Sequence, residues 1–320
     1  MSASVVSLIR WLTPLLLPMF LGAALARTGR LPVGGRALDG LNTYALYVAF
    51  PALIAHGLLA SQIALPSEWA FWGLWPVSLV LCLVGVGGWR AVRAPVQEAA
   101  PMALALSFGN VAYLGLPYVT FFVDPSLKAH TLLVTTIHVV LAVTLGPVVY
   151  ARWSGVQGQS AKVVARRVLG LPLFWAPWIG LVGRAAGPDV AAEVARVAQP
   201  FARSAIPVVL FMLGAYLYEH RASLRRWDRQ IVSVLGARLL LAPAVVLLLG
   251  WGAYGAGVLS SQALGIHVLM AGMPVAITTF SLAKDFRTKP EQMASAIVWS
   301  TLLSMISLPL WWVLVGWLVG

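Results

Sequence analysis

The sequence predicts an all-α integral membrane protein of ten transmembrane helices, arranged as two inverted five-helix repeats. Three observations support this prediction. First, the 320 residues are 60% hydrophobic and 10% charged, with a mean hydropathy of +0.86, whereas soluble domains are about 45–50% apolar. Second, apolar runs long enough to cross a bilayer recur along the whole chain. Third, glycine and proline interrupt these runs in the same order in both halves.

Ten segments satisfy the requirement of roughly 20 mostly apolar residues for a membrane-spanning helix. They are Val5–Ala26, Leu41–Ala60, Trp69–Trp89, Glu98–Val123, Ala129–Tyr150, Leu171–Ala186, Phe201–Tyr218, Gln230–Trp251, Val258–Ala283 and Glu291–Leu318. The longest connections, 151–170 and 187–200, are too short for a separate soluble domain. The first segment lacks the basic start and cleavage pattern of a signal peptide, so we expect it to remain as a span.

The basic residues predict the orientation of the chain in a cell membrane, either the plasma or the inner membrane. The formal net charge is +12, but these residues lie in short loops and not on one soluble face, so no nucleic acid partner is expected. Placing the loops alternately on two sides gathers 16 of the 22 basic residues on one side: Arg27, Arg30, Arg36, Arg90, Arg93, Arg152, Lys162, Arg166, Arg167, Arg221, Arg225, Arg226, Arg229, Lys284, Arg287 and Lys289. Lys and Arg accumulate in cytoplasmic loops. Both termini are therefore expected on the non-cytoplasmic side.

No enzymatic site is expected from the sequence. Cys82 is the one cysteine, and no Cys or His spacing typical of a metal site occurs. The sequence also lacks Gly-x-Ser-x-Gly, His-Glu-x-x-His and any pair of acidic residues inside a span. We therefore expect no catalytic residue, metal or cofactor, and a coupling ion, H⁺ or Na⁺, stays open.

The two predicted repeats occupy residues 1–150 and 171–320, joined by a cytoplasmic linker at 151–170. The first span contains PLLLPMFLG, and the sixth contains PLFWAPWIG with similar punctuation. Five spans per repeat invert the second half in the membrane. Inverted repeats of this kind are typical of secondary transporters.

The fourth span contains the stretch ALSFGNVAYLGLP, which predicts an interrupted helix. Pro117 has no N–H donor, and its ring clashes with the carbonyl group of Tyr113. Gly109 and Gly115 add backbone freedom. We therefore expect a hinge between Gly109 and Leu116.

The ninth span has a corresponding break at Gly272, Met273 and Pro274, followed by Thr278 and Thr279. Broken helices in corresponding positions of two repeats indicate a transporter binding site. The N-termini of the half-helices would offer unpaired N–H groups to an anion such as a carboxylate. Ordinary proline kinks, whose freed carbonyl groups are bonded by neighbouring helices, are the alternative.

These segments resemble those of the auxin efflux carrier family. GNVAYLGLP is similar to the family's fourth-span signature, MPVAITTFSLAKDFRTKPEQMASAIVW to its ninth span, loop and tenth span, and FPAL at 50–53 to its second-span pattern. The resemblance covers essentially the whole chain. It implies a fold similar to those of bile-acid/sodium symporters and NhaA-like antiporters, with a scaffold of spans 1, 2, 6 and 7. Spans 3–5 and 8–10 would form the transport unit, in which spans 4 and 9 cross.

The resemblance also implies a function. The chain would be a secondary transporter that moves a small organic anion, either auxin-like or a carboxylate such as malonate, by elevator-type alternating access. In the plant relatives the asparagine that matches Asn110 contacts the substrate carboxylate, although capping of the broken helix is its alternative role. The other expected substrate-binding residues are Gly109, Val111, Met273, Pro274 and Val275. Sodium-coupled symport, a receptor or channel on the same fold, and a homodimer through the scaffold stay open.

Four further polar residues are candidates for coupling or anion contact: His138, Arg238, Thr135 and Thr278. His138 would exchange a coupling proton or form a neutral hydrogen bond between helices. Arg238 would bind a carboxylate through its guanidinium fork or extend to the cytoplasmic boundary. Thr135 would contribute a hydroxyl group to a sodium site. Glu98, by contrast, is expected only to complement a helix dipole.

Overall fold

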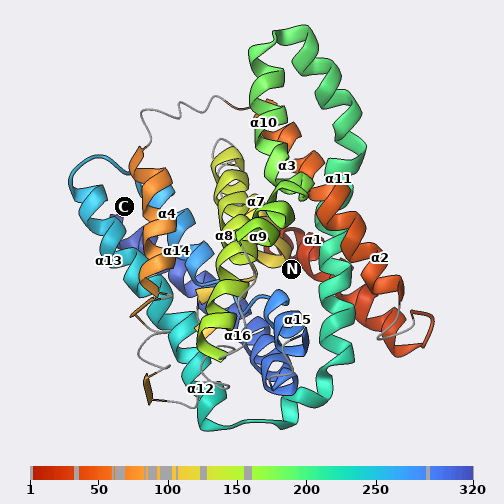
Figure 1. Cartoon of the computed structure of the whole chain (residues 1–320), viewed down its shortest axis with the longest axis vertical. Helices are drawn as coiled ribbons and strands as arrows, with labels where there is room; N and C mark the ends of the chain where they lie inside the picture. The colour runs from red at the N-terminus through yellow and green to blue at the C-terminus, as the bar shows by residue number, and fades with distance from the viewer. Residues whose placement is uncertain are drawn as a thin grey trace. The chain divides into compact units, whose positions relative to one another are not determined.

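The computed structural model describes residues 3–31, 36–59, 61, 69–82, 84–85, 92–93, 103–105, 107–122, 128–154, 161–285 and 289–319. These residues form helices and loops, as Figure 1 shows, and one isolated β-bridge. Within them, five helical stretches are long and apolar enough to cross a membrane: Ala37–Leu59, Lys128–Gly146, Pro188–Glu219, Arg229–Gly255 and Pro290–Val319. The prediction of an all-helical membrane protein is therefore confirmed. Glu98 lies outside the described residues.

The chain divides into two compact units according to the contacts inside each. Unit 1 comprises Met1–Ile63, Ala112–Thr136 and Leu169–Arg221, and unit 2 comprises Ala64–Val111, Ile137–Val168 and Ala222–Gly320. The helical segments η4 (Val111–Gly115) and α8 (Lys128–Ser154) each contribute several residues to one unit and at least one to the other. The interrupted fourth span therefore changes unit immediately after its break.

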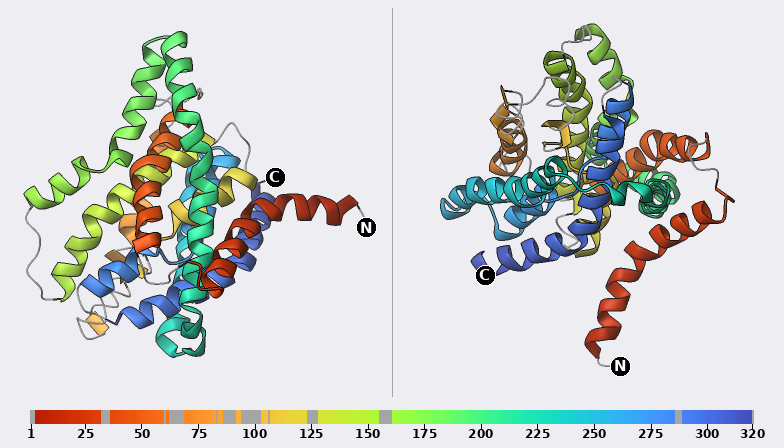
Figure 2. Two further views of the ribbon diagram at one scale, coloured as in Figure 1. Left: turned by 90° about the vertical axis from the view of Figure 1, so that its right-hand side faces the viewer. Right: turned by 90° about the horizontal axis from the view of Figure 1, so that it is seen from below.

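Unit 1 is built around a long helix, α11 (Pro188–Glu219). The other helices of the unit are α1 (Ala3–Arg27), α2 (Arg36–Tyr44), η1 (Ala45–Ala49), α3 (Phe50–Leu59), α7 (Leu116–Phe122) and α10 (Pro172–Ala185). Figure 2 shows α10 and α11 as an antiparallel pair. Their tight turn contains Gly187 at φ 110°, a conformation that only glycine adopts without strain.

Helix α11 begins earlier than the sequence predicts. The expected span started at Phe201, with 187–200 as a loop, but the helix begins at Pro188 and continues through Pro200. Proline is well tolerated in the first turn of a helix, where its missing N–H has no partner to lose. The following residues AAEVARVAQ are mostly good helix formers. The difference therefore follows from helix propensity in a segment that is less apolar than the span after it.

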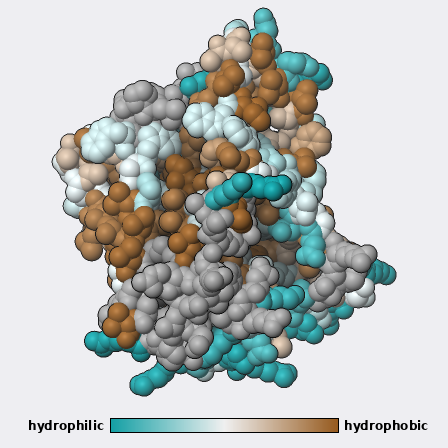
Figure 3. All heavy atoms as spheres, in the orientation of Figure 1, coloured by the Kyte–Doolittle hydropathy of each residue, from teal (hydrophilic) through white to brown (hydrophobic). Residues whose placement is uncertain are grey.

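Unit 2 contains the segments that carry most of the predicted site. Its helices are α4 (Trp69–Cys82), α9 (Ala161–Leu169, except its last residue), α12 (Arg229–Gly236), η7 (Ala237–Leu241), α13 (Ala242–Gly255), α14 (Ser261–Ala271), α15 (Thr278–Asp285) and α16 (Pro290–Val319), with η6 (Arg221–Arg225) at its border. Helix α13 packs against α4 and α14, and α14 also packs against α16. In Figure 3 hydrophobic atoms cover the exposed part of α13, and hydrophilic atoms gather near η6 and the start of α12.

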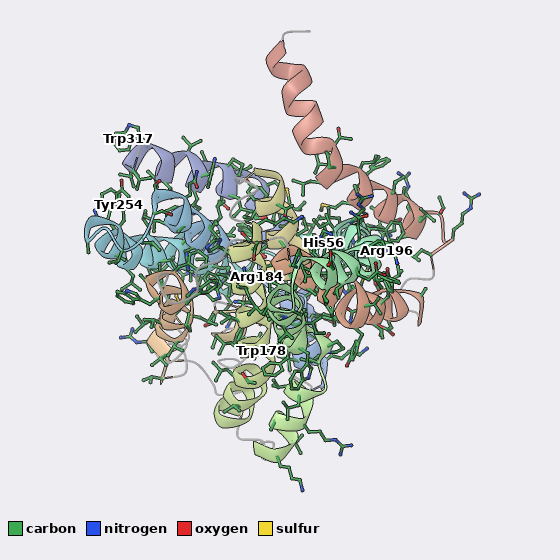
Figure 4. All side chains as sticks on the ribbon, turned by 90° about the horizontal axis from the view of Figure 1, so that it is seen from above. His56, Trp178, Arg184, Arg196, Tyr254 and Trp317 are labelled. Carbon is green, nitrogen blue, oxygen red and sulfur yellow. The ribbon has the colours of Figure 1, made fainter. Side chains whose placement is uncertain are left out.

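Aromatic side chains mark the ends of α13 and α16. Tyr254 and Trp317 lie at these ends in Figure 4, where the Tyr254 hydroxyl donates to the Val319 carbonyl oxygen at 3.1 Å. Trp317 is 79% exposed. An exposed tryptophan beside a hydrogen-bonded tyrosine is typical of a membrane–water interface.

Three prolines follow short π-helical segments at the same spacing. η1 ends two residues before Pro51, η4 ends two residues before Pro117, and η7 ends two residues before Pro243. In η1 and η7 the N–H before the proline donates to the carbonyl oxygen five residues earlier. The wider turn moves the preceding carbonyl groups away from the proline ring, so the helix continues where an α-helical turn would clash. These prolines are therefore accommodated inside helices.

Candidate functional site

The interruptions of the fourth and ninth predicted spans meet within unit 2. Gly109 and Val275 form an antiparallel bridge. The N–H of Asn110 donates to the carbonyl oxygen of Pro274 at 2.7 Å, and the N–H of Ala276 donates to that of Phe108 at 3.0 Å. The two non-helical stretches therefore supply hydrogen-bond partners for each other's backbone N–H and carbonyl groups. This pairing is the kind of internal compensation that irregular backbone needs in a membrane protein.

The break in the fourth span lies at residues 108–110, which include Gly109, and not at Pro117. Ser107 is helical, 108–110 are not, and helical structure resumes at Val111 as the π-helix η4. Gly115 ends η4, and Pro117 is the second residue of α7. Because the π-helix accommodates Pro117, the non-helical residues lie at the glycine end of the expected interval.

The gap in the ninth span separates α14 from α15. Gly272 caps the C-terminus of α14, and Met273 and Pro274 are non-helical and buried. The N–H of Val275 donates to the Ser300 hydroxyl of α16 at 3.0 Å. The backbone N–H groups of Asn110, Val275 and Ala276 therefore all have protein partners. An anion at this place would be bound by side chains and charge, and not by these three amides.

The Arg238 side chain binds one backbone carbonyl group at each of the two breaks. Its Nε donates to the Met273 carbonyl oxygen at 2.7 Å and its Nη1 to the Ser107 carbonyl oxygen at 3.1 Å. The residue is 2% exposed. The guanidinium is therefore buried inside unit 2 and does not reach its surface. Two donors of its fork are occupied by backbone oxygen atoms.

Gly109 makes room for this guanidinium. A Cβ atom at Gly109 would overlap the Arg238 Nη2 and would lie 3.3 Å from the Met273 Cβ. The close approach requires a residue without a side chain. Gly109 therefore forms the bridge with Val275 and also leaves the space that the Arg238 guanidinium occupies.

His138 binds a carbonyl group inside the break of the fourth span. Its Nε2 lies 3.1 Å from the Gly109 carbonyl oxygen, so the ring donates from Nε2 to that oxygen. The ring packs near Trp75 and Phe108, with centroid distances of 5.6 and 5.7 Å. Its Nδ1 is buried and has no hydrogen-bond partner within the described part of the chain. The hydrogen bond and the two aromatic contacts therefore fix the imidazole ring beside Gly109.

The Asn110 side chain is a buried donor of the site that lacks a partner among the described residues, as are the Ser107 hydroxyl and the Trp75 indole N–H. The residue is 3% exposed, and its Nδ2 atom has no hydrogen-bond partner among the described residues. A buried amide of this kind costs about 1–3 kcal/mol unless something binds it. The amide donates two hydrogen bonds and is suited to a carboxylate oxygen.

A small pocket lies on the Arg238 side of the paired breaks. It is lined by Trp75, Ser78, Leu79, Cys82, Ser107, Arg238, Ala242, Val246 and Ala271, and its volume of about 20 Å³ is enough for about one water molecule. No group of three or more His, Cys, Asp or Glu side chains that could hold a metal ion occurs among the described residues. The pocket offers hydroxyl groups, a thiol and a guanidinium.

The remaining predicted residues have other surroundings. Val111 is buried at the start of η4. Thr135, in unit 1, donates to the Thr131 carbonyl oxygen of its own helix at 2.8 Å. Thr278 is exposed at the start of α15, whereas its neighbour Thr279 is buried and donates to the Ala276 carbonyl oxygen at 2.6 Å.

Sequence reasoning did not identify Ser107 and Ser300. Both lie in apolar helices, and neither belongs to the segments that carry the family resemblance. Ser300 contributes its hydroxyl to Val275, and Ser107 contributes its carbonyl oxygen to Arg238. Every residue has a backbone carbonyl oxygen, so its use as an acceptor cannot be predicted from the residue type.

Comparisons with known proteins found a matching family model and two similar transporters. Residues 7–312 match the model of the family described as "Membrane transport protein". A protein of Rhizobium meliloti (strain 1021) named "Putative malonate transporter" is 25% identical over 306 residues, which cover 92% of each chain. An "Uncharacterized transporter" of Methanothermobacter thermautotrophicus is 24% identical over 286 residues, covering 87% of this chain and 89% of its own.

Proposed function

Because the chain belongs to the membrane transport protein family, which includes the auxin efflux carriers, we propose that it is a secondary transporter of a small organic anion. It is a membrane transporter and not an enzyme. A carboxylate is the proposed cargo, with malonate as the first compound to test because the similar protein of Rhizobium meliloti bears that name. An auxin-like monocarboxylate is the second.

The observation that carries this proposal is the buried Asn110 amide without a partner among the described residues, at the paired breaks. The neighbouring residue, Gly109, touches the Arg238 guanidinium. The Asn110 amide is therefore a hydrogen-bond donor in the residue next to Gly109, which contacts the positively charged Arg238. This combination favours an anion over a cation or a neutral solute.

The proposed mechanism is alternating access of the elevator type. The scaffold would consist of α1–α3, α10 and α11. The moving part would consist of α4, η4, α7, α8 and α12–α16. The grouping of contacts supports this division, because unit 1 contains the former helices and unit 2 contains most of the latter. Residues 112–136, which include α7 and the first part of α8, group with unit 1 instead, so the contacts support the division for the other helices only.

The test is uptake by the purified full-length protein in proteoliposomes. Labelled malonate, an auxin and a panel of other mono- and dicarboxylates would be offered with and without pH and sodium gradients, beside protein-free liposomes. We expect saturable accumulation or exchange of at least one carboxylate. If none is taken up and none raises the unfolding temperature, the proposal is wrong.

A further inference from the structure

The buried Arg238 performs a task that the proposed function does not itself explain. In many transporters with broken helices, unwound carbonyl groups and the C-terminal ends of half-helices coordinate a coupling cation. Here two such carbonyl groups, those of Ser107 and Met273, accept hydrogen bonds from one guanidinium. The protein's own side chain supplies the cation at this place.

The electrostatics of the two helix ends match one positive charge. The last carbonyl groups of a helix carry a partial negative charge, equivalent to about half an elementary charge per helix end. Ser107 is the last helical residue before the first break, and Met273 follows the C-cap of α14. One guanidinium shared by both ends therefore complements both dipoles in a buried place, where such interactions are strong.

The fit of the side chain indicates that this arrangement is built into the fold. Arg238 lies in the π-helix η7, which also accommodates Pro243. Gly109 has no side chain where the guanidinium passes. The backbone of two separate elements is therefore shaped around a single charged group.

We infer that Arg238 is a tethered cation that replaces a coupling sodium ion at the paired breaks, so that binding and transport of the anion require the charge at position 238 and are independent of sodium. This inference rests on the proposed function for its substrate. Arg238 acts as a positioning residue, because it holds the two carbonyl groups that flank the breaks and places its charge beside Gly109. The sodium-coupled alternative would need the same carbonyl oxygens for the ion.

The first experiment measures uptake of labelled malonate, or of whichever carboxylate the uptake panel finds, in sodium and in choline buffers of equal ionic strength. The wild type is expected to give equal rates in both. Arg238→Gln is expected to lose about tenfold or more, which corresponds to about 1.4 kcal/mol, and Arg238→Lys to retain most of the rate. Arg184→Gln is the matched control, because Arg184 also donates to a backbone carbonyl oxygen, that of Ser61 at 2.8 Å, but in unit 1.

Two results of this experiment would overturn the inference. One is a wild-type rate that a sodium gradient increases. The other is a folded Arg238→Gln protein that transports at the wild-type rate. Loss in Arg238→Lys equal to that in Arg238→Gln would show that the fork and not the charge matters, and it would also refute the tethered cation.

A second experiment does not depend on transport, so it separates failure of this inference from failure of the proposed function. The unfolding temperatures of the wild type and of Arg238→Ala are measured while sodium replaces choline. Sodium is expected to stabilise Arg238→Ala, whose carbonyl groups are vacated, and not the wild type. Stabilisation of the wild type by sodium, or of neither protein, contradicts the inference. If Arg238→Ala does not fold, Arg238→Gln takes its place in the same titration.

Discussion

The backbone N–H of Asn110 donates to the carbonyl oxygen of Pro274 at 2.7 Å, joining the interruption of one helix to the interruption of another. A proline contributes no N–H to a hydrogen-bond ladder but keeps its carbonyl oxygen as an acceptor. Pro274 therefore donates no hydrogen bond to its own helix. Its carbonyl oxygen accepts the Asn110 N–H, which has no helical acceptor. The pair explains how two irregular segments are stable inside an apolar unit.

Substituting Asn110→Ala is expected to weaken carboxylate binding. A hydrogen bond to a charged group contributes about 1.5–3 kcal/mol, so affinity for malonate should fall roughly 10- to 100-fold while the protein stays folded. The measurement is malonate binding by calorimetry. Ser307→Ala is the control, because its buried hydroxyl also has no partner in the described structure but lies in α16, away from the breaks in sequence. Unchanged affinity in Asn110→Ala would remove this residue from the site.

Substituting Gly109→Ala is expected to destabilise unit 2. The new Cβ would overlap a guanidinium that two hydrogen bonds hold in place. Overpacking of this kind costs about 1–3 kcal/mol and should lower the unfolding temperature. In the control Gly146→Ala the nearest atom, Leu282 Cδ1, lies at an ordinary 3.5 Å. Equal unfolding temperatures for Gly109→Ala and the wild type would contradict the observed close approach.

Substituting Ser300→Ala is expected to leave the Val275 N–H buried without an acceptor. The cost of an unsatisfied buried donor is about 1–3 kcal/mol. Ser304→Ala provides a control one turn further along α16, since its hydroxyl donates to Thr301 of the same helix at 2.7 Å and its loss strands no backbone donor. Thermal unfolding of both variants measures the difference. A Ser304→Ala protein as unstable as Ser300→Ala would argue against this role for Ser300.

Replacing His138 by glutamine is expected to leave the pH profile of uptake unchanged. The ring donates from Nε2 to Gly109 and packs between aromatic side chains, and a glutamine amide offers a similar donor. Uptake would be measured between about pH 5.5 and pH 8, where an ordinary histidine changes charge. His130→Gln, in the same helix, is the control. A profile that flattens only in His138→Gln would instead identify His138 as a proton carrier.

In unit 1, Gly214→Ala is expected to separate α1 from α11. A Cβ at Gly214 would overlap the backbone carbonyl of Met19, which cannot rotate away as a side chain can. We expect a loss of about 1–3 kcal/mol or more, seen as a lower unfolding temperature. Gly40→Ala should have little effect, because nothing lies within 4 Å of its Cβ position. Comparable losses in both variants would contradict the close helix packing.

The helical membrane character could be predicted from hydropathy, because apolar length is a property of local sequence. The extent of α11 could not be predicted in the same way, since Pro188–Gln199 is helical without being strongly apolar. Pro117 was expected to interrupt its helix, and the π-helix before it prevents this. A proline shows that a helix must adjust, but not whether it breaks or widens.

For the site, Gly109, Asn110 and Pro274 could be singled out because their residue types are unusual inside an apolar run. Their partners could not be predicted. The acceptors of Arg238 are backbone oxygen atoms, and the acceptor of the Val275 N–H is one serine among several in α16. Such pairings depend on which segments meet in space, and residue type carries no information about that.

The bridge between the breaks has one further consequence. Two of its hydrogen bonds, Asn110 to Pro274 and Ala276 to Phe108, use main-chain atoms alone. Apart from Gly109, where a side chain would overlap Arg238, these two hydrogen bonds do not depend on the side chains of the residues that form them. A substitution at Asn110 or Val275 can therefore alter what the protein recognises without unfastening the two helices. Residues that recognise the substrate can therefore change while the main-chain hydrogen bonds between the two breaks are kept.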